Sequence, residues 1–164
     1  MDPLQELREI EAIKQLKYRY MRSIDQKDWE LMRRCFTPDA TTSYSGGKYA
    51  FEGIDAIMKF MTESMDRKSF LSSHRVHHPE IALESETSAT GIWALEDFVR
   101  FVPGLDMRGY GHYHETYEKE DGRWRIKSSK LTRLREDIVT PLFSVYVSDR
   151  IRRLLAIAAR SRID

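Results

Sequence analysis

The chain has 164 residues, of which 41% are hydrophobic, and one cysteine, Cys35. This length suits one domain with its own core, and a single cysteine excludes an internal disulfide and a cysteine metal cluster. The formal net charge of +1 gives no overall attraction to nucleic acid or to a membrane surface. The N-terminal segment lacks the basic start and apolar run of a secretory signal, and no apolar stretch approaches the roughly 18 residues of a membrane span. We therefore expect an intracellular, cytoplasmic protein without nucleic-acid or membrane partners.

The first third of the chain predicts helices. Apolar residues recur every three or four positions from Leu4 to Ile24, which indicates a long amphipathic helix. Asp28 can cap a short second helix that carries Cys35 and Phe36 and ends at the following proline. In this helical pattern Cys35 is expected to be a small buried hydrophobe.

A short hairpin and a third helix are expected next. Strands predicted over residues 41–44 and 49–51 flank a glycine-rich turn at residues 45–48. After Gly53, apolar residues recur with helical spacing at Ile54, Ile57, Met58, Phe60 and Met61. This third helix is expected to lie over the sheet formed by the rest of the chain.

The second half of the chain predicts four long strands, over residues 72–83, 88–102, 109–119 and 123–134. The dipeptide at residues 121–122, Asp-Gly, is a strong hairpin signal between the last two. Helices followed by antiparallel strands indicate an α+β fold in which N-terminal helices pack on a strongly curved, mostly antiparallel sheet and form a cone. We expect a cone domain over residues 1–136 and a C-terminal extension, residues 137–164, belonging to the same domain.

The extension predicts an extra C-terminal helix after Pro141, with arginines at positions 150, 152, 153, 160 and 162. The simplest interpretation is a solvated face on a terminal helix. An apolar stripe opposite the arginines, Ile151, Leu154, Leu155 and Ile157, also permits an anionic-ligand or membrane-surface element. Packing on the protein or on a neighbouring subunit is favoured.

Strand alternation directs Asp97 inward, and because it places His74 and His77 on opposite faces of their strand, it also directs one of these histidines inward. Asp97 shares a face with apolar residues such as Trp93 and Val99, so its carboxylate needs a cation, a hydrogen-bond donor or a proton. A structural ion pair, for instance with Arg133, and a functional role are both open for Asp97. A histidine suits proton transfer near neutral pH when a carboxylate fixes its tautomer. Taken alone, His74 would more often be a structural histidine. A metal site made with His77 and His78 is less favoured than proton transfer, because three ligands within five residues of a strand cannot converge on one ion.

Asp25 and Tyr20 lie near the end of the first predicted helix. The negative end of the helix dipole disfavours a carboxylate there, so Asp25 requires a compensating partner. Tyr20 is five residues earlier, about 140° around an ideal helix, so the two share a cavity only if the pocket wraps around the helix end. From the residues alone, a core tyrosine and a turn aspartate are the simpler interpretations.

Several short segments, in the same order along residues 10–133, match one protein family. They are Ile10-Glu11-Ala12-Ile13-Lys14, Thr42-Ser43-Tyr44-Ser45, His77-His78-Pro79-Glu80-Ile81, Ala89-Thr90-Gly91-Ile92-Trp93, Leu95-Glu96-Asp97, Tyr117-Glu118-Lys119 and Asp121-Gly122-Arg123-Trp124. On these segments the chain resembles the SnoaL-like proteins of the nuclear-transport-factor-2-like superfamily, most closely its bile acid 7α-dehydratase branch. Tyr20, Asp25, His74, Asp97 and Arg133 match dehydratase active-site positions.

The resemblance implies a cystatin-like cone and a cofactor-independent dehydratase that eliminates water from a cyclic, steroid-like ketone. By this resemblance His74 is the general base next to a conjugated carbonyl, Asp25 orients it, and Tyr20 donates a hydrogen bond to the reacting oxygen. Tyr44 would line the cavity, and Asp97 with Arg133 would form its opposite polar wall and bind substrate. No metal or redox cofactor is implied, and a homo-oligomer, with a trimer favoured, is expected.

Two alternatives stay open. An isomerase or dehydrohalogenase could use the same pair of His74 and Asp25, since both reactions also begin with proton abstraction. A non-catalytic ligand-binding or assembly subunit, like the small subunits of ring-hydroxylating dioxygenases, would share the cone without needing that pair. The chain departs from the bile acid branch at residues 104–111 and after Arg133, which leaves the substrate open.

Overall fold

In the computed structural model, the structure describes residues 2–148 and residue 151. These residues form three α-helices, one 3-10 turn and seven strands. In chain order the elements are α1 (Pro3–Gln26), α2 (Trp29–Arg33), β1 (Phe36–Tyr44), η1 (Ser45–Gly47), β2 (Tyr49–Glu52), α3 (Ile54–Met65), β3 (Leu71–Leu83), β4 (Ser88–Val102), β5 (Leu105–Glu120), β6 (Arg123–Val139) and β7 (Ser144–Tyr146).

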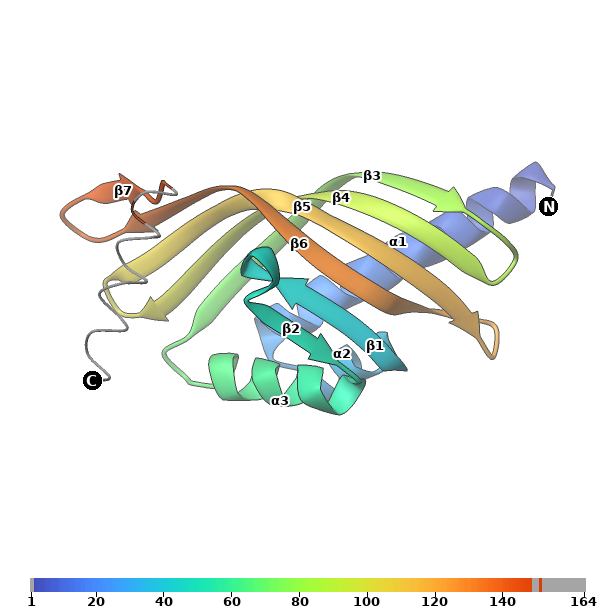
Figure 1. Ribbon diagram of the computed structural model, residues 1–164, viewed down its shortest axis with the longest axis horizontal. Helices are drawn as coiled ribbons and strands as arrows, with labels where there is room; N and C mark the ends of the chain where they lie inside the picture. The colour runs from blue at the N-terminus through green and yellow to red at the C-terminus, as the bar shows by residue number, and fades with distance from the viewer. Residues whose placement is uncertain (1, 149–150, 152–164) are drawn as a thin grey trace.

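The strands form one curved, open sheet with the order β2-β1-β6-β5-β4-β3, and β7 pairs with β6. β1 and β6 are parallel, whereas the other neighbouring strands are antiparallel. Figure 1 shows α3 below the sheet and α1 passing behind the long strands, so the helices cover one face. The predicted α+β fold, with helices packed on a strongly curved and mostly antiparallel sheet, is confirmed.

The long first helix, α1, begins and ends at recognisable caps. Asp2 accepts hydrogen bonds from the backbone N–H groups of Leu4 and Gln5, and Lys27 ends the helix with a φ of 58°. The apolar stripe includes Ile13 and Leu16 and is buried against the sheet. The helix extends to Gln26, beyond the predicted Ile24, which places Asp25 in its last turn.

The second helix is shorter than the sequence predicts, because α2 ends at Arg33 and Phe36 already belongs to β1. The backbone carbonyl of Cys35 accepts a hydrogen bond from the N–H of Ile126, and Phe36 is paired with Ile126 in the parallel ladder. This pairing with β6, about ninety positions later in the chain, overrides the local helical pattern. Cys35 is buried, and burial raises the pKa of its thiol to about 11.

The end of the sheet also differs from the prediction. β6 continues past Leu134 to Val139, and the chain then turns at Pro141 and adds the short strand β7, which the sequence pattern did not indicate. The turn closes with hydrogen bonds between Thr140 and Phe143 rather than with a glycine-rich signal. Apart from Ile151, the predicted basic helix lies outside the described residues, including Arg150, Arg152, Arg153, Arg160 and Arg162.

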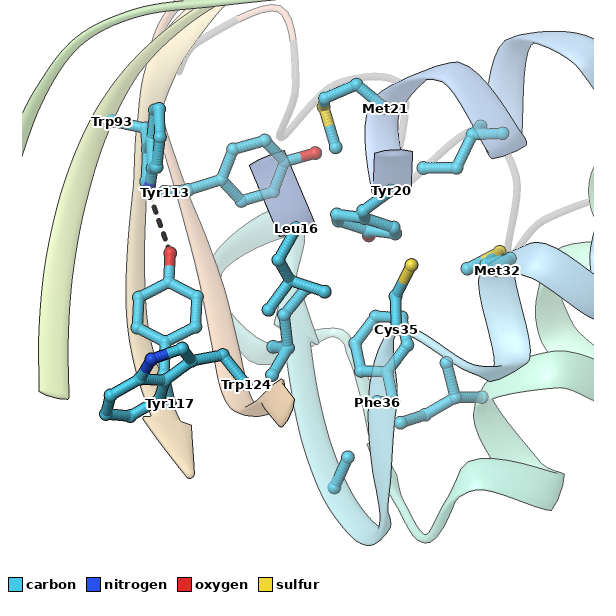
Figure 2. Packing of buried hydrophobic residues seen from close by; sticks show 14 of the residues in the cluster. Leu16, Tyr20, Met21, Met32, Cys35, Phe36, Trp93, Tyr113, Tyr117 and Trp124 are labelled. Atoms are coloured by element: carbon cyan, nitrogen blue, oxygen red, sulfur yellow. Dashed lines mark hydrogen bonds between the residues drawn. The ribbon is translucent and has the colours of Figure 1, made fainter. Parts of the chain in front are cut away.

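The core lies between α1 and the concave face of the sheet. In Figure 2, Tyr113 extends from the sheet toward α1, where Tyr20 lies, and Trp93 donates a hydrogen bond to the hydroxyl of Tyr117 at 2.7 Å. Burial of large apolar side chains such as these contributes to the hydrophobic driving force for folding. Across the described part of the chain, no helix is both long and apolar enough to cross a membrane.

Candidate active site

A cavity of about 450 Å³ lies between α1, α3 and the concave face of the sheet. This size is in the range of cavities that enclose small organic ligands. Its wall is mainly aromatic and apolar. The aromatic side chains come from both helices, from the sheet and from the segment after α3, and they include Tyr20, Tyr44, Phe60, Phe70, Phe101 and Tyr113. The cavity combines an apolar interior with few charged or titrating side chains, which are His74, Asp97, Arg133 and the exposed Arg67.

His74 and Asp25 form a closely bonded pair at one side of the cavity. The ring Nδ1 of His74 lies 2.7 Å from Oδ1 of Asp25, and the backbone N–H of His74 donates to Oδ2 at 2.9 Å. The hydroxyl of Ser72 donates to Oδ1 at 2.8 Å. The sequence argument required a carboxylate for His74 and a compensating partner for Asp25. The two residues meet these requirements for each other.

The environment keeps Asp25 ionised. Burial acts to raise the pKa of Asp25, but hydrogen bonds from the ring and backbone of His74, together with Ser72, hold the pKa below its usual value. Since an ionised carboxylate only accepts hydrogen bonds, Nδ1 of His74 carries a proton. In the neutral ring, Nε2 is then the nitrogen with a free lone pair.

Tyr20 and Asp25 point to different sides of α1, as their spacing around the helix predicts. Tyr20 lines the cavity, whereas Asp25 lies beside an outer depression that His74 also borders. Asp25 is thus behind the histidine ring and outside the cavity wall. The side chain of His74 is only 8% exposed and lies between the cavity and the outer depression.

Tyr20 and Tyr44 form the phenol side of the cavity. Their hydroxyl oxygens are 3.5 Å apart, a long hydrogen bond in which either group can be the donor. Burial raises the pKa of Tyr20 well above its usual value and that of Tyr44 to about 12. Both phenols therefore stay protonated at physiological pH and can act as hydrogen-bond donors.

Asp97 and Arg133 form a polar wall beside His74 and not opposite it, because Asp97 is the direct partner of His74 in the ladder between β3 and β4. Two parallel hydrogen bonds of 2.8 and 2.7 Å join the guanidinium to the carboxylate. Both side chains are largely buried, and although burial opposes it, the bonds to Asp97 raise the pKa of Arg133. A second carboxylate, Glu136, lies 3.4 Å from Nε of Arg133. Arg133 is thus part of a neutralised pair, and the other arginine that lines the cavity, Arg67, is exposed.

Gly109 provides the space for this pair. It is the direct partner of Asp97 in the ladder between β4 and β5. A Cβ atom at Gly109 would lie 2.1 Å from Oδ1 of Asp97 and 2.2 Å from Nη1 of Arg133. The ion pair therefore lies directly over the strand backbone, which requires glycine.

Several supporting residues were missed at the sequence level. Ser72 is two residues before His74 on the same strand face, so alternation could have indicated it. Lys17 falls on the apolar stripe of α1 between Ile13 and Tyr20. A charged residue on an apolar stripe indicates a buried ion pair, so the sequence could have suggested one here. Its partner Glu115, 2.6 Å away, could not be identified from spacing because it is nearly one hundred positions distant in the chain.

The other histidines of β3 do not join His74. His77 is exposed and lies on the other face of the strand from His74, as alternation predicts, and His78 follows it at a bulge with a φ of 47°. Among residues 2–148 and 151, no three His, Cys, Asp or Glu side chains are grouped as metal ligands.

Comparison with known proteins places these features in a family context. The model of the SnoaL-like domain matches residues 5–130, which include His74, Asp25, Tyr20 and Asp97. Arg133 lies just beyond the matched range.

Solved structures similar to this chain have the same cone. A scytalone dehydratase candidate from Novosphingobium aromaticivorans is 27% identical, with a TM-score of 0.75 over 80% of this chain and 87% of that chain. A hexachlorocyclohexane dehydrochlorinase from Novosphingobium barchaimii is 13% identical, with a TM-score of 0.72 over 90% of this chain and 96% of that one. A candidate aromatic ring hydroxylase from N. aromaticivorans is 16% identical, with a TM-score of 0.70 over 89% and 96% of the two chains. The last two share the fold alone.

Proposed function

Because this chain belongs to the SnoaL-like domain family, we propose that it is a cofactor-independent carbon–oxygen lyase that eliminates water from a cyclic, steroid-like ketone. The observation that carries the proposal is the position of His74, whose Nδ1 is 2.7 Å from Asp25 while its ring borders an apolar cavity. The similarity to a scytalone dehydratase candidate supports elimination of water. The sequence resemblance to the bile acid branch suggests the steroid-like substrate.

In the proposed reaction, Nε2 of His74 removes a proton from a carbon next to the conjugated carbonyl system. The electrons of the broken C–H bond form a new C=C bond as the C–O bond to the departing hydroxyl breaks. Asp25 stabilises the imidazolium formed on His74, and this imidazolium returns its proton to the leaving oxygen as water. Substrate and products therefore balance without a net gain or loss of protons.

Tyr20 is proposed to donate a hydrogen bond to the oxygen that gains negative charge. Its raised pKa suits this role, because a phenol that stays protonated stabilises the charged oxygen without giving up its proton. A pre-positioned donor of this kind can contribute about 3 kcal/mol to lowering the barrier. Tyr44 would take the second donor position, since its hydroxyl is 3.5 Å from that of Tyr20.

The cavity favours a neutral, flat substrate. Arg133 is neutralised by Asp97 and flanked by Glu136, so it offers no free positive charge to a bound anion. Aromatic rings dominate the wall, and they favour a rigid apolar ring system. Asp97 and Arg133 are proposed to hydrogen-bond a polar group of the substrate next to His74, because Asp97 is the direct partner of His74 in the ladder between β3 and β4.

The test is turnover of 3-oxo-4-ene steroids with and without a 7α-hydroxyl group, followed by the absorbance of the conjugated diene. Only the hydroxylated compound should react, and His74→Ala should abolish turnover. His77→Ala is the matched control, since His77 is exposed on the opposite face of the same strand, and it should retain activity. Absence of turnover, or equal loss in both variants, would count against steroid dehydration.

Elimination of a halide is the second candidate reaction, because it begins with the same proton abstraction by His74. The shared fold of the dehydrochlorinase supports including it. Hexachlorocyclohexane should therefore be tested in parallel, with chloride release as the readout. Release of chloride that depends on His74, without steroid turnover, would replace the dehydratase assignment.

A homotrimer remains part of the proposal. The outer face of the sheet carries exposed apolar side chains, with Leu134 at 69% and Ile92 at 38% exposure. These side chains could be covered by a neighbouring copy. Light scattering coupled to size-exclusion chromatography measures the mass directly, and a monomeric mass would contradict the trimer. Co-purification with a larger iron-containing partner would instead favour the assembly-subunit alternative.

A further inference from the structure

A second pocket, of about 560 Å³, lies between α1, α2 and the hairpin that joins β5 to β6. It shares no lining residue with the candidate active site. Its floor is apolar and includes Ala12, Leu16, Leu31 and Cys35. Its remaining lining is strongly basic, with Arg8, Arg19, Arg34, Lys119, Arg123 and Arg125. We call it the arginine pocket.

Only part of this positive charge is neutralised by the protein. Lys119 lies 2.7 Å from Oε1 of Glu9, and Arg125 lies 2.6 Å from Oε2 of Glu120. Within residues 2–148 and 151, no carboxylate oxygen comes within 4.0 Å of the four other guanidinium groups, which belong to Arg8, Arg19, Arg34 and Arg123. Four unpaired guanidinium groups around one pocket are a strong local excess in a chain whose net charge is +1.

The arginines are placed around the apolar floor in a regular way. Arg8, Ala12 and Arg19 share one stripe of α1, because eleven residues correspond to about three helical turns and roughly 16 Å along the axis. The small side chain of Ala12 leaves the space between the two arginines open. Arg34 approaches from α2, and the charges of Arg19 and Arg34 act to lower the pKa of Cys35 on the floor, although burial has the larger effect.

We propose that the arginine pocket binds a small organic phosphate. The guanidinium groups would hold the phosphate oxygens through charge-assisted hydrogen bonds, a geometry that arginine provides in a planar fork. The apolar body of the ligand would lie on the floor beside Ala12 and Leu16. A phosphate carries more charge than a carboxylate and three acceptor oxygens, so it matches several arginines better than a carboxylate does. This binding does not depend on the proposed lyase activity.

The test is isothermal titration calorimetry of the full chain with 1-naphthyl phosphate, at low and at physiological ionic strength. Binding should weaken as salt is added, because the charges are near the surface. Arg19→Gln/Arg34→Gln should weaken binding about tenfold or more. Ala12→Trp, which fills the pocket without changing its charge, should have a similar effect. Inorganic phosphate should bind more weakly than 1-naphthyl phosphate, since it lacks the apolar body.

Arg108→Gln is the matched control, because Arg108 is an exposed arginine of β5 that lines neither pocket. It should bind as the unsubstituted chain does. The proposal is overturned if 1-naphthyl phosphate does not bind, if Arg108→Gln loses as much affinity as the double variant, or if Ala12→Trp binds as tightly as the unsubstituted chain. If the double variant fails to fold, as judged by circular dichroism, Ala12→Trp alone decides. His74→Ala should leave the affinity unchanged, which separates this site from the catalytic proposal.

Discussion

The carboxylate of Asp25 holds His74 at two points, because Oδ1 lies 2.7 Å from the ring Nδ1 and Oδ2 accepts the backbone N–H at 2.9 Å. The contact with Nδ1 fixes the ring and the contact with the backbone N–H fixes the strand, so the orientation of the ring is set relative to β3. Ser72 adds a third bond to the same carboxylate. A histidine supported in this way does not need to reorganise when a ligand binds beside it.

Asp25→Asn should lower kcat roughly 10²–10⁴-fold with little change in KM. The amide can donate a hydrogen bond to Nδ1, which favours the tautomer that carries its proton on Nε2 and is unable to act as base. Steady-state kinetics on the substrate identified for the chain provides the measurement. Ser72→Ala is the matched control, since it removes one hydrogen bond from Asp25 but keeps the charge, and its kcat should fall less than about tenfold. An unchanged kcat in Asp25→Asn would contradict the assigned role.

The stabilisation provided by the ionised Asp25 should disappear in acid. Its pKa is lowered in the folded protein, so the contribution is complete above the pKa of an unfolded aspartate, about 3.9, and is lost as the pH falls through the lower folded value. The difference in unfolding free energy between the unsubstituted chain and Asp25→Asn should therefore shrink as the pH falls below about 4. Urea unfolding at each pH measures it. A difference that grows in acid would have the wrong sign.

Much of the fold could be predicted because it depends on local patterns. The helical spacing in α1 and α3 and the two-residue alternation in the long strands both survive in the structure. Alternation also predicted the inward direction of Asp97 and the placement of His74 and His77 on opposite faces of β3, since side-chain direction along a strand alternates with sequence position. These are properties of short segments, and they need no knowledge of distant partners.

What the residues alone could not provide is pairing between distant segments. The parallel pairing of β1 with β6 converts Phe36 from a predicted helical residue into a strand residue. The contact between His74 and Asp25 joins positions 49 apart, and it was anticipated only through the family resemblance. Gly109 shows the same limit, because its role depends on which ion pair lies over it.

Gly109→Ala should destabilise the protein by about 2–4 kcal/mol, because the added methyl group would collide with the buried ion pair of Asp97 and Arg133. Chemical denaturation measures the loss. In a double-mutant cycle with Asp97→Ala, the combined cost should be less than the sum of the two single costs, since removing the carboxylate relieves part of the collision. Strictly additive costs would show that the strain arises elsewhere.

Lys17→Met should destabilise the protein by about 3–5 kcal/mol, because it leaves the buried carboxylate of Glu115 without its cation. Both side chains are fully buried, and the ammonium also lies 3.5 Å from the centre of the Tyr113 ring. Hydrogen bonds from Tyr117 and Ser129 remain on Glu115 but do not supply a positive charge. Urea unfolding gives the loss.

The double variant Lys17→Met/Glu115→Leu distinguishes loss of the cation from loss of packing around Lys17. If the unpaired charge causes the destabilisation, the double variant should recover a large part of the stability, since apolar replacements of a buried pair are often neutral or stabilising. The recovery should be incomplete, because Tyr117 and Ser129 lose their shared acceptor. A double variant less stable than Lys17→Met would instead mean that Glu115 is more important as the acceptor for these two hydroxyl groups than as the partner of Lys17.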